Sequence, residues 1–251
     1  MKTIYRLGVM MVAVAALLAL SMPVQASKMD NSIESSAKNS YVFKTYLQAD
    51  DIKVQSEDGA VTLTGTVSEE SHKSLAQDTV ADLPGVKSVD NRLEVKGTPP
   101  AKMSDAWITA KVKTVFLFHS NVSAITEINT KDGVVTLQGK ANTQAQKDLT
   151  TEYAKDVEGV KGVNNEMTVT KTANTKQTVG QKIDDASITA QVKMTLLYHR
   201  STSALKTSVT TKSGVVTLSG KAKSGAEMDL ATKFANDVNG VKSVNNRMTI
   251  E

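Results

Sequence analysis

Residues 133–139 read Gly-Val-Val-Thr-Leu-Gln-Gly, and nearly the same seven-residue pattern recurs at residues 59–65 and 214–220. In each copy the last glycine is followed 20 residues later by another glycine, which opens a Gly-Val-Lys-x-Val-x-Asn segment. These segments end at Asn91, Asn165 and Asn246. A period of roughly 75–80 residues is too long for a solenoid repeat and fits a small domain in tandem. The sequence therefore predicts three copies of one module.

The second copy shows how one module is expected to fold. Asp105 is typical of a helix start, and residues 131–133, Lys-Asp-Gly, indicate a turn between two β-rich stretches. Thr143 is a cap for a second helix that ends at Gly159, and residues 163–169 form a last strand. This α-β-β-α-β order predicts an α+β fold. In each of three tandem domains, two helices pack on a three-stranded mixed sheet with a right-handed crossover.

We expect the three domains to span residues 39–96, 105–170 and 184–251, with a shortened first helix in the first domain. Pro99-Pro100 stiffens the first linker, whereas the second linker is polar and looser. The repeated glycines are expected to be structural, because they fall at turns and helix ends where positive φ angles are needed. They are Gly59, Gly65, Gly85, Gly133, Gly139, Gly159, Gly214, Gly220 and Gly240.

Residues 1–26 have the pattern of an export signal. Lys2 and Arg6 form a basic start, residues 7–20 are apolar, and Val24-Gln25-Ala26 supplies the small residues of a cleavage site. We expect a signal peptide cleaved after Ala26 and a bacterial periplasmic location; an uncleaved anchor is the alternative, although a spanning helix needs about 20 apolar residues. The chain has no Cys, which excludes a lipid-modified cysteine, disulfides and thiolate metal sites.

The charge is nearly balanced but unevenly distributed. Without residues 1–26 the chain has 28 basic and 26 acidic residues, which is unlike a nucleic-acid-binding protein. The three expected domains carry net charges of −4, −1 and +3, in chain order. Two interpretations remain open. The differences are ordinary variation among exposed faces, or the third domain faces an anionic surface that the first one avoids.

The repeated segments resemble the BON domain family. The resemblance rests on Asp-x-x-Ile-Thr-Ala-x-Val-Lys, Gly-Val-Val-Thr-Leu-x-Gly and Gly-Val-Lys-x-Val-x-Asn. It covers residues 105–167 and 185–248 in full and the second half of the first module. The resemblance implies the αββαβ fold, an exported bacterial protein, and an association with membranes and with osmotic or envelope stress.

Trp107 is the only Trp, and on a helical wheel it lies in line with Lys111, Thr114 and Phe118. An exposed line of rings and lysines suits a lipid interface, because the rings enter the headgroup region while the ammonium groups meet phosphate. Tyr41 is the candidate counterpart of Trp107 in the first module. The alternative is that Trp107 packs against a neighbouring module. The expected phospholipid-binding residues are Trp107, Lys111, Lys113, Phe118, Lys193 and Tyr198.

The remaining polar residues do not predict catalysis. His119 and His199 occupy equivalent positions near the ends of two helices, so they share a metal only if their domains touch; helix-end electrostatics explains them otherwise. Adjacent acidic residues point in different directions, and no Gly-x-Ser-x-Gly motif is present. We expect no enzyme, metal, cofactor or nucleic-acid partner.

The sequence thus predicts a periplasmic protein that binds anionic phospholipid surfaces and helps protect the envelope under osmotic stress. This prediction rests on two observations. One is the line of aromatic and basic residues on the first helix of module two, and the other is the resemblance to the BON domain family. The alternative is a protein-interaction or chaperone-like module for exported proteins, because three modules on polar joints also suit weak multivalent binding.

Overall fold

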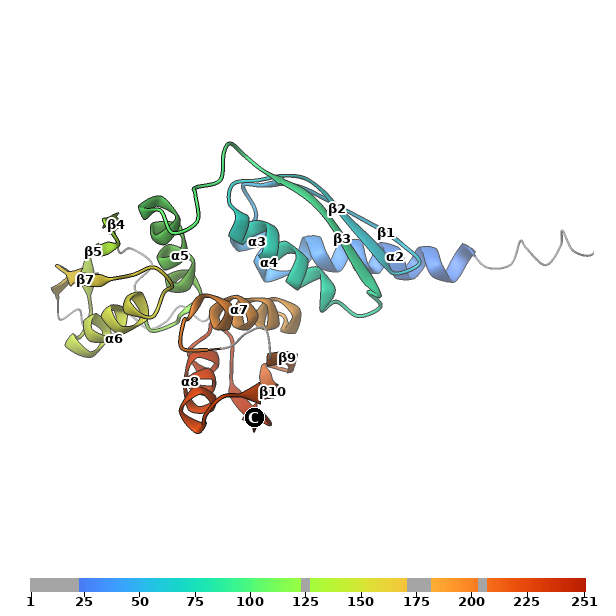
Figure 1. Cartoon of the computed structure of the whole chain (residues 1–251). Helices are drawn as coiled ribbons and strands as arrows, with labels where there is room; N and C mark the ends of the chain where they lie inside the picture. Colours follow the sequence, from blue (N-terminus) through green and yellow to red (C-terminus); the bar gives the residue numbers. More distant parts are fainter. Residues whose placement is uncertain (1–22, 123–126, 171–181, 203–206) are drawn as a thin grey trace, which may run out of the picture.

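The computed structural model describes residues 23–122, 127–170, 182–202 and 207–251. It contains three modules of the same topology, which follow one another along the colour gradient of Figure 1 from blue and teal, through green and yellow, to orange and red. In every module the middle strand runs antiparallel to the first strand and parallel to the last one. The predicted α+β fold of three small αββαβ domains is confirmed. Most of the predicted export signal lies outside the described residues.

The second module begins with helix α5 (Asp105–Phe118), which Ser104 caps by accepting a hydrogen bond from the Trp107 amide. Thr143 caps the second helix as predicted. The short pair β6–β8 continues the parallel pairing of β5 and β7 past Gly139. The other elements are β4 (Glu127–Lys131), β5 (Val134–Gln138), β6 (Lys140–Ala141), α6 (Gln144–Lys155), β7 (Gly162–Asn165) and β8 (Thr168–Val169).

The third module repeats this arrangement with an unbroken middle strand. Asp184 and Ser224 cap its two helices, each through a side chain that accepts a backbone N–H. Its elements are α7 (Asp185–Tyr198), β9 (Thr207–Lys212), β10 (Val215–Ala222), α8 (Gly225–Asn236), β11 (Ser243–Asn246) and β12 (Thr249–Ile250).

The first module differs from its predicted start. Its first helix, α2 (Pro23–Asn39), precedes the expected boundary at residue 39, and a separate short helix, α3 (Tyr41–Thr45), follows. The expectation of a shortened first helix is therefore wrong. The second helix of this module begins after Glu69 without a side-chain cap, and the hydroxyl of Ser68 lies 3.0 Å from His72 Nδ1. The other elements are β1 (Asp51–Glu57), β2 (Ala60–Val67), α4 (Glu70–Ala81) and β3 (Ser88–Val95).

A repeated aspartate ties the first helix of each module to the hairpin turn. Asp105 accepts hydrogen bonds from the amides of Asp132 and Gly133, at 2.8 and 2.9 Å. Asp30 and Asp185 make the same contacts with the corresponding turns. Asp30 thus fixes the register of α2, because it lies 29 residues before Gly59, as Asp185 lies 29 before Gly214.

The repeated glycines and asparagines have structural contacts in all three modules. Gly133 has φ +82°, and a Cβ there would lie 3.0 Å from Lys161, whose Nζ donates to the carbonyl of Asp132. All nine glycines named from the sequence have positive φ angles. Asn165 donates to the carbonyl of Lys147 in the second helix and accepts from the amide of Met167, between β7 and β8. The motif residues therefore hold the module together.

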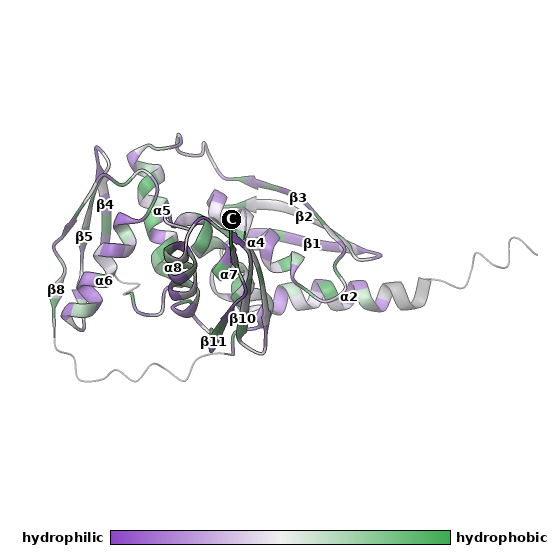
Figure 2. Ribbon diagram, turned by 60° about the horizontal axis from the view of Figure 1, so that its bottom comes forward, coloured by the Kyte–Doolittle hydropathy of each residue, from purple (hydrophilic) through white to green (hydrophobic). Residues whose placement is uncertain are grey.

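Helix α7 lies at the centre of the molecule. It contacts α4 of the first module, α5 of the second, and α8 and β9 of its own module. Figure 2 shows it between α8 and the first module, with apolar residues along its length. Eleven of its residues are buried, including polar Ser187, Thr189, Gln191 and Thr195. A helix of a small two-layer module normally exposes one face, so the burial of both faces reflects the neighbouring modules.

Candidate functional site: a groove between modules and the contacts that form it

The aspartate that ends the second helix of each module binds a cationic or imidazole side chain from another module. These residues are equivalent, each lying three positions before the repeated glycine. Asp82 pairs with Lys193 at 2.9 Å, Asp156 with His199 at 3.0 Å, and Asp237 with His119 at 3.0 Å. Burial raises the pKa of Asp82, and Lys193 partly offsets this effect. The three modules are thereby joined through one recurring helix end.

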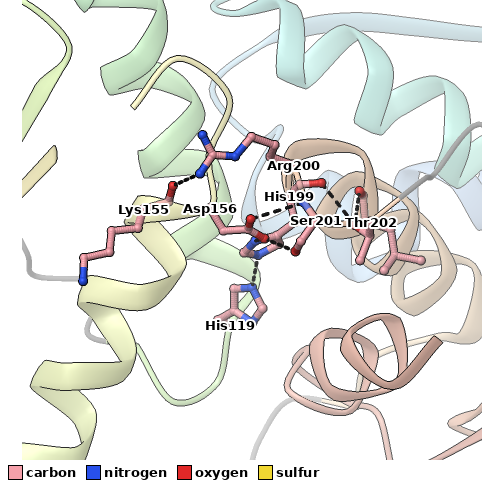
Figure 3. Close-up of polar contacts among 8 residues, drawn as sticks. His119, Lys155, Asp156, His199, Arg200, Ser201 and Thr202 are labelled. Atoms are coloured by element: carbon pink, nitrogen blue, oxygen red, sulfur yellow. Dashed lines mark hydrogen bonds and ion pairs between the residues drawn. The ribbon is translucent and has the colours of Figure 1, made fainter. Parts of the chain in front are cut away.

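Two histidines meet where module two contacts module three. The Nε2 atoms of His119 and His199 lie 3.1 Å apart, and both side chains are fully buried (Figure 3). His119 stacks on Tyr153 with ring centroids 4.0 Å apart, and His199 stacks on Phe234 at 3.9 Å. The sequence analysis placed these histidines near helix ends but did not predict that they touch.

A groove of about 880 Å³ lies between module one, the linker after it, α5 and the end of α7. The charged residues of the lining are four lysines and three carboxylates, which are Glu69, Glu70 and Asp105. Apolar area comes from the linker prolines and two aromatic rings. The lining residues used below are Lys96, Lys102, Lys111, Lys113, Trp107 and Tyr198, with Pro99 and Pro100.

Lys111 is the most unusual residue of the groove. Its Nζ lies 3.4 Å from the ring centroid of Tyr198 and 5.2 Å from that of Trp107. Burial lowers the pKa of Lys111 to about 8, although Glu158 and Glu70 act in the opposite direction. In the part of the chain that the structure describes, no hydrogen bond or ion pair satisfies this ammonium group. Two aromatic faces therefore supply its close partners.

The predicted lipid-binding residues do not form one exposed line. Phe118 is 1% exposed and packs edge-on against Tyr46 at 5.4 Å. Tyr198 is buried beneath Lys111, and the Lys193 ammonium is paired with Asp82. The expectation that Phe118 and Tyr198 insert into lipid from this arrangement is wrong, because the line of α5 that carries Phe118 faces other modules.

Trp107, Lys111 and Tyr198 do come together, although Tyr198 belongs to a different module. Trp107 is partly buried against the core, and Lys113 is exposed on the same helix. Tyr41 is not the counterpart of Trp107: the Asp30 register aligns Ser32 there, and the Tyr41 amide donates to Asp184 of module three. Trp107 is linked to Tyr198 of module three through Lys111, whose ammonium group lies over both rings.

The described residues offer few alternatives to a binding surface. Among them, no group of three or more His, Cys, Asp or Glu side chains is placed to hold a metal ion. None of the helices within the described ranges has the length and apolar character to cross a bilayer. The intermodule aspartates could have been noticed from their fixed distance to the repeated glycines, but their partners could not, because those come from unrelated positions.

Comparison with known proteins identifies relatives of the repeated module. The BON domain family model matches residues 29–97, 104–171 and 184–251. The first match begins ten residues before the expected boundary at residue 39 and includes Asp30 of α2.

Two curated proteins are similar to more than half of this chain. The osmotically-inducible protein Y of Escherichia coli (strain K12) is 38% identical over 147 residues, which cover 57% of this chain and 71% of that protein. An uncharacterized protein in the gshII 5′ region of Anaplasma centrale is 30% identical over 142 residues, covering 57% and 91%.

Among solved structures, CdsD, a structural protein of the type III secretion system of Chlamydia trachomatis, matches 84% of this chain and 90% of its own. Its TM-score of 0.25 and sequence identity of 15% are too low to bear on function. The three family matches together span most of the chain. They include the Asp, Gly, Lys and Asn contacts that recur in every module, and the chain therefore belongs to the BON domain family.

Proposed function

We propose that this chain is an exported envelope protein that binds anionic phospholipid headgroups in the groove between modules one and two. It acts by binding, without catalysis, and helps protect the envelope under osmotic stress. The similarity to an osmotically inducible protein of Escherichia coli supports the link to osmotic stress, and the sequence pattern of residues 1–26 supports export to the periplasm.

The unpaired ammonium of Lys111 carries the proposal of a headgroup site. A half-buried cation without a hydrogen-bond acceptor is costly, and a phosphate oxygen would supply the missing acceptor. Lys102 and Lys113 on the same groove add charge, while the partly exposed ring of Trp107 and the linker prolines offer an apolar surface to the glycerol region. An anionic amphiphile fits this combination better than a small inorganic ion, which would leave the aromatic lining without a partner.

Vesicle titration tests this site directly. Trp107 lines the groove and is the only Trp, so its emission reports binding there. We expect a blue shift and co-sedimentation with phosphatidylglycerol vesicles, weakened by salt, and neither with phosphatidylcholine vesicles. Lys111→Gln should weaken binding about fivefold, since roughly 1 kcal/mol per basic residue is at stake near an anionic membrane.

The matched control is Lys131→Gln, which makes the same charge change on an exposed strand end outside the groove. Equal losses in both variants would show general charge attraction and refute the groove as the headgroup site. If no vesicle binds and the chain instead suppresses aggregation of an unfolded protein without lipid, the interaction with exported proteins would replace the phospholipid proposal.

A further inference from the structure

The contact between His119 and His199 requires a specific number of protons. His119 Nδ1 lies 3.0 Å from an oxygen of Asp237, and His199 Nδ1 lies 3.0 Å from an oxygen of Asp156. Their Nε2 atoms lie 3.1 Å apart, which is hydrogen-bond distance. Figure 3 shows His119 and His199 with this direct contact between their rings. Each ring is therefore held at both nitrogens.

Both aspartates are ionised acceptors. Asp237 receives hydrogen bonds from the hydroxyls of Tyr153 and Ser120, and Asp156 receives them from the hydroxyl and amide of Ser201. Burial raises the pKa of each carboxyl, but the histidine hydrogen bond and these other donors outweigh it and hold the pKa below its ordinary value. A carboxylate only accepts, so both Nδ1 atoms must carry hydrogen.

The remaining two nitrogens accommodate one proton between them. With none, two lone pairs would face each other at 3.1 Å; with two, two N–H groups would do so. One proton gives an N–H···N bond between an imidazolium and an imidazole. Burial, the largest effect, lowers the pKa of His119, which disfavours a second proton on this pair.

The groups around the pair do not separate the two Nε2 atoms, so a second proton would place two N–H groups against each other. Tyr153 faces the pair from α6, and burial raises the pKa of Tyr153 so that it stays neutral. Phe234 faces it from α8, and Arg200 turns its guanidinium to the carbonyl of Lys155. The charged groups at the contact are thus two carboxylates, one shared proton and a nearby guanidinium.

We propose that His119 and His199 share one proton and that uptake of a second proton separates module two from module three. The contact is then a pH-sensitive switch built into the fold. Backbone pairing depends on it: His119 and His199 form isolated β-bridges with Val238 and Val157, and the amide of Asn239 donates to the carbonyl of Phe118. Separation exposes these apolar residues together with Tyr153 and Phe234.

The direction of the pH effect follows from linkage. In the closed contact His119 has a lowered pKa, whereas in the open form it returns toward about 6.5. The open form therefore binds more protons below pH 6.5, and the closed form loses stability as the pH falls. The lowered pKa values of Asp156 and Asp237 also make the closed form less stable as the pH falls. This effect is confined to pH values near and below the ordinary carboxyl value of 3.8. A loss of stability of the closed form between pH 6.5 and 5 is therefore caused by protonation of the histidines.

The switch can be measured by energy transfer between the two modules. Ala145 in α6 and Ala226 in α8 are exposed and equivalent, and the chain has no Cys of its own. In the full chain with both changed to Cys and labelled, we expect the highest transfer near pH 7, where one proton is shared. The ratio of closed to open molecules should fall up to about tenfold per pH unit below 6.5 for each proton taken up.

Two control variants decide the assignment. The double variant His119→Gln/His199→Gln should lose the pH step, while His72→Gln should retain it, because His72 pairs with Asp50 inside module one. An unchanged step in the double variant, a step lost in His72→Gln, or constant transfer in the parent chain would each overturn the proposal.

A measurement on the unsubstituted chain tests the proposal even if the substituted chains do not fold. Nitrogen-15 NMR at pH 7 should show both Nδ1 atoms protonated and one proton shared between the two Nε2 atoms. Two neutral rings with no shared proton would contradict the switch. Opening of the contact by a chelator at pH 7 would mean that a metal ion bridges the rings, which also overturns proton sharing.

Discussion

At the residue scale, the most informative side chain is the aspartate that accepts two turn amides. Asp185 receives the N–H groups of Ser213 and Gly214 at 2.6 and 2.8 Å. Hydrogen bonds to a charged acceptor contribute about 1.5–3 kcal/mol, and the freed amides would face the helix start without a partner. Asp185→Ala should therefore lower the free energy of unfolding by about 1–3 kcal/mol, as measured by urea denaturation followed by circular dichroism.

The control for this change lies in the same module. Asp229 is an exposed residue of α8. Asp229→Ala should change stability by less than about 0.5 kcal/mol, as expected for a surface position. Equal effects of the two substitutions would show that removal of negative charge, rather than the loss of the turn contacts, sets the stability of the module.

At the element scale, each module could be predicted because its stabilising residues recur. The Asp-to-Gly distance of 28 or 29 residues, the positive-φ glycines and the asparagine bonds are local and appear three times. Helix α2 was missed because its sequence is polar: Ile33 and Ala37 are its buried apolar residues in the described part. The spacing from Asp30 to Gly59 equals that from Asp185 to Gly214 and would have predicted the position of α2.

Helix α7 contains one polar group that its burial leaves without a partner. Among the described residues, the hydroxyl of Thr195 is buried and makes no hydrogen bond. The equivalent position of α5 is Val115, which has the same shape without the hydroxyl. Thr195→Val should therefore stabilise the protein by about 0.5–2 kcal/mol, because an unsatisfied buried hydroxyl is removed without leaving a cavity. Thermal unfolding measures this.

A matched substitution in the same helix should act in the opposite direction. The hydroxyl of Thr189 is bonded to that of Thr211 at 2.7 Å. Thr189→Val should destabilise the protein by about 1 kcal/mol, because it leaves the partner hydroxyl unsatisfied. Stabilisation by both changes would mean that added apolar character in α7 matters more than the satisfaction of individual hydroxyls.

At the scale of the whole molecule, the sequence could not predict how the modules meet. A helical wheel separates a core face from its opposite face, but it does not tell whether the opposite face meets water or another module. Phe118 and Tyr198 were therefore expected at a membrane, and the structure buries them between modules. The module was identified by comparing its three copies in the sequence. The contacts between modules differ from one pair of modules to the next, so this comparison could not predict them.

The arrangement makes module three the centre of assembly, and this can be tested by deletion. Helix α7 packs on both α4 and α5, whereas Tyr46 joins module one to module two by a ring contact with Phe118 and a 3.4 Å bond to the carbonyl of Leu117. A chain ending at residue 170 loses α7 and exposes the apolar faces that covered it. Its two modules should then move independently.

Small-angle scattering distinguishes the two expected fragments. Residues 103–251 retain the His119–His199 contact and should form one body with a radius of gyration of about 15 Å, the value for a compact chain of about 150 residues. Residues 27–170 are similar in length but should give a clearly larger radius, because two linked modules separate. A compact second fragment would show that module one binds module two without α7, and the central role of that helix would be refuted.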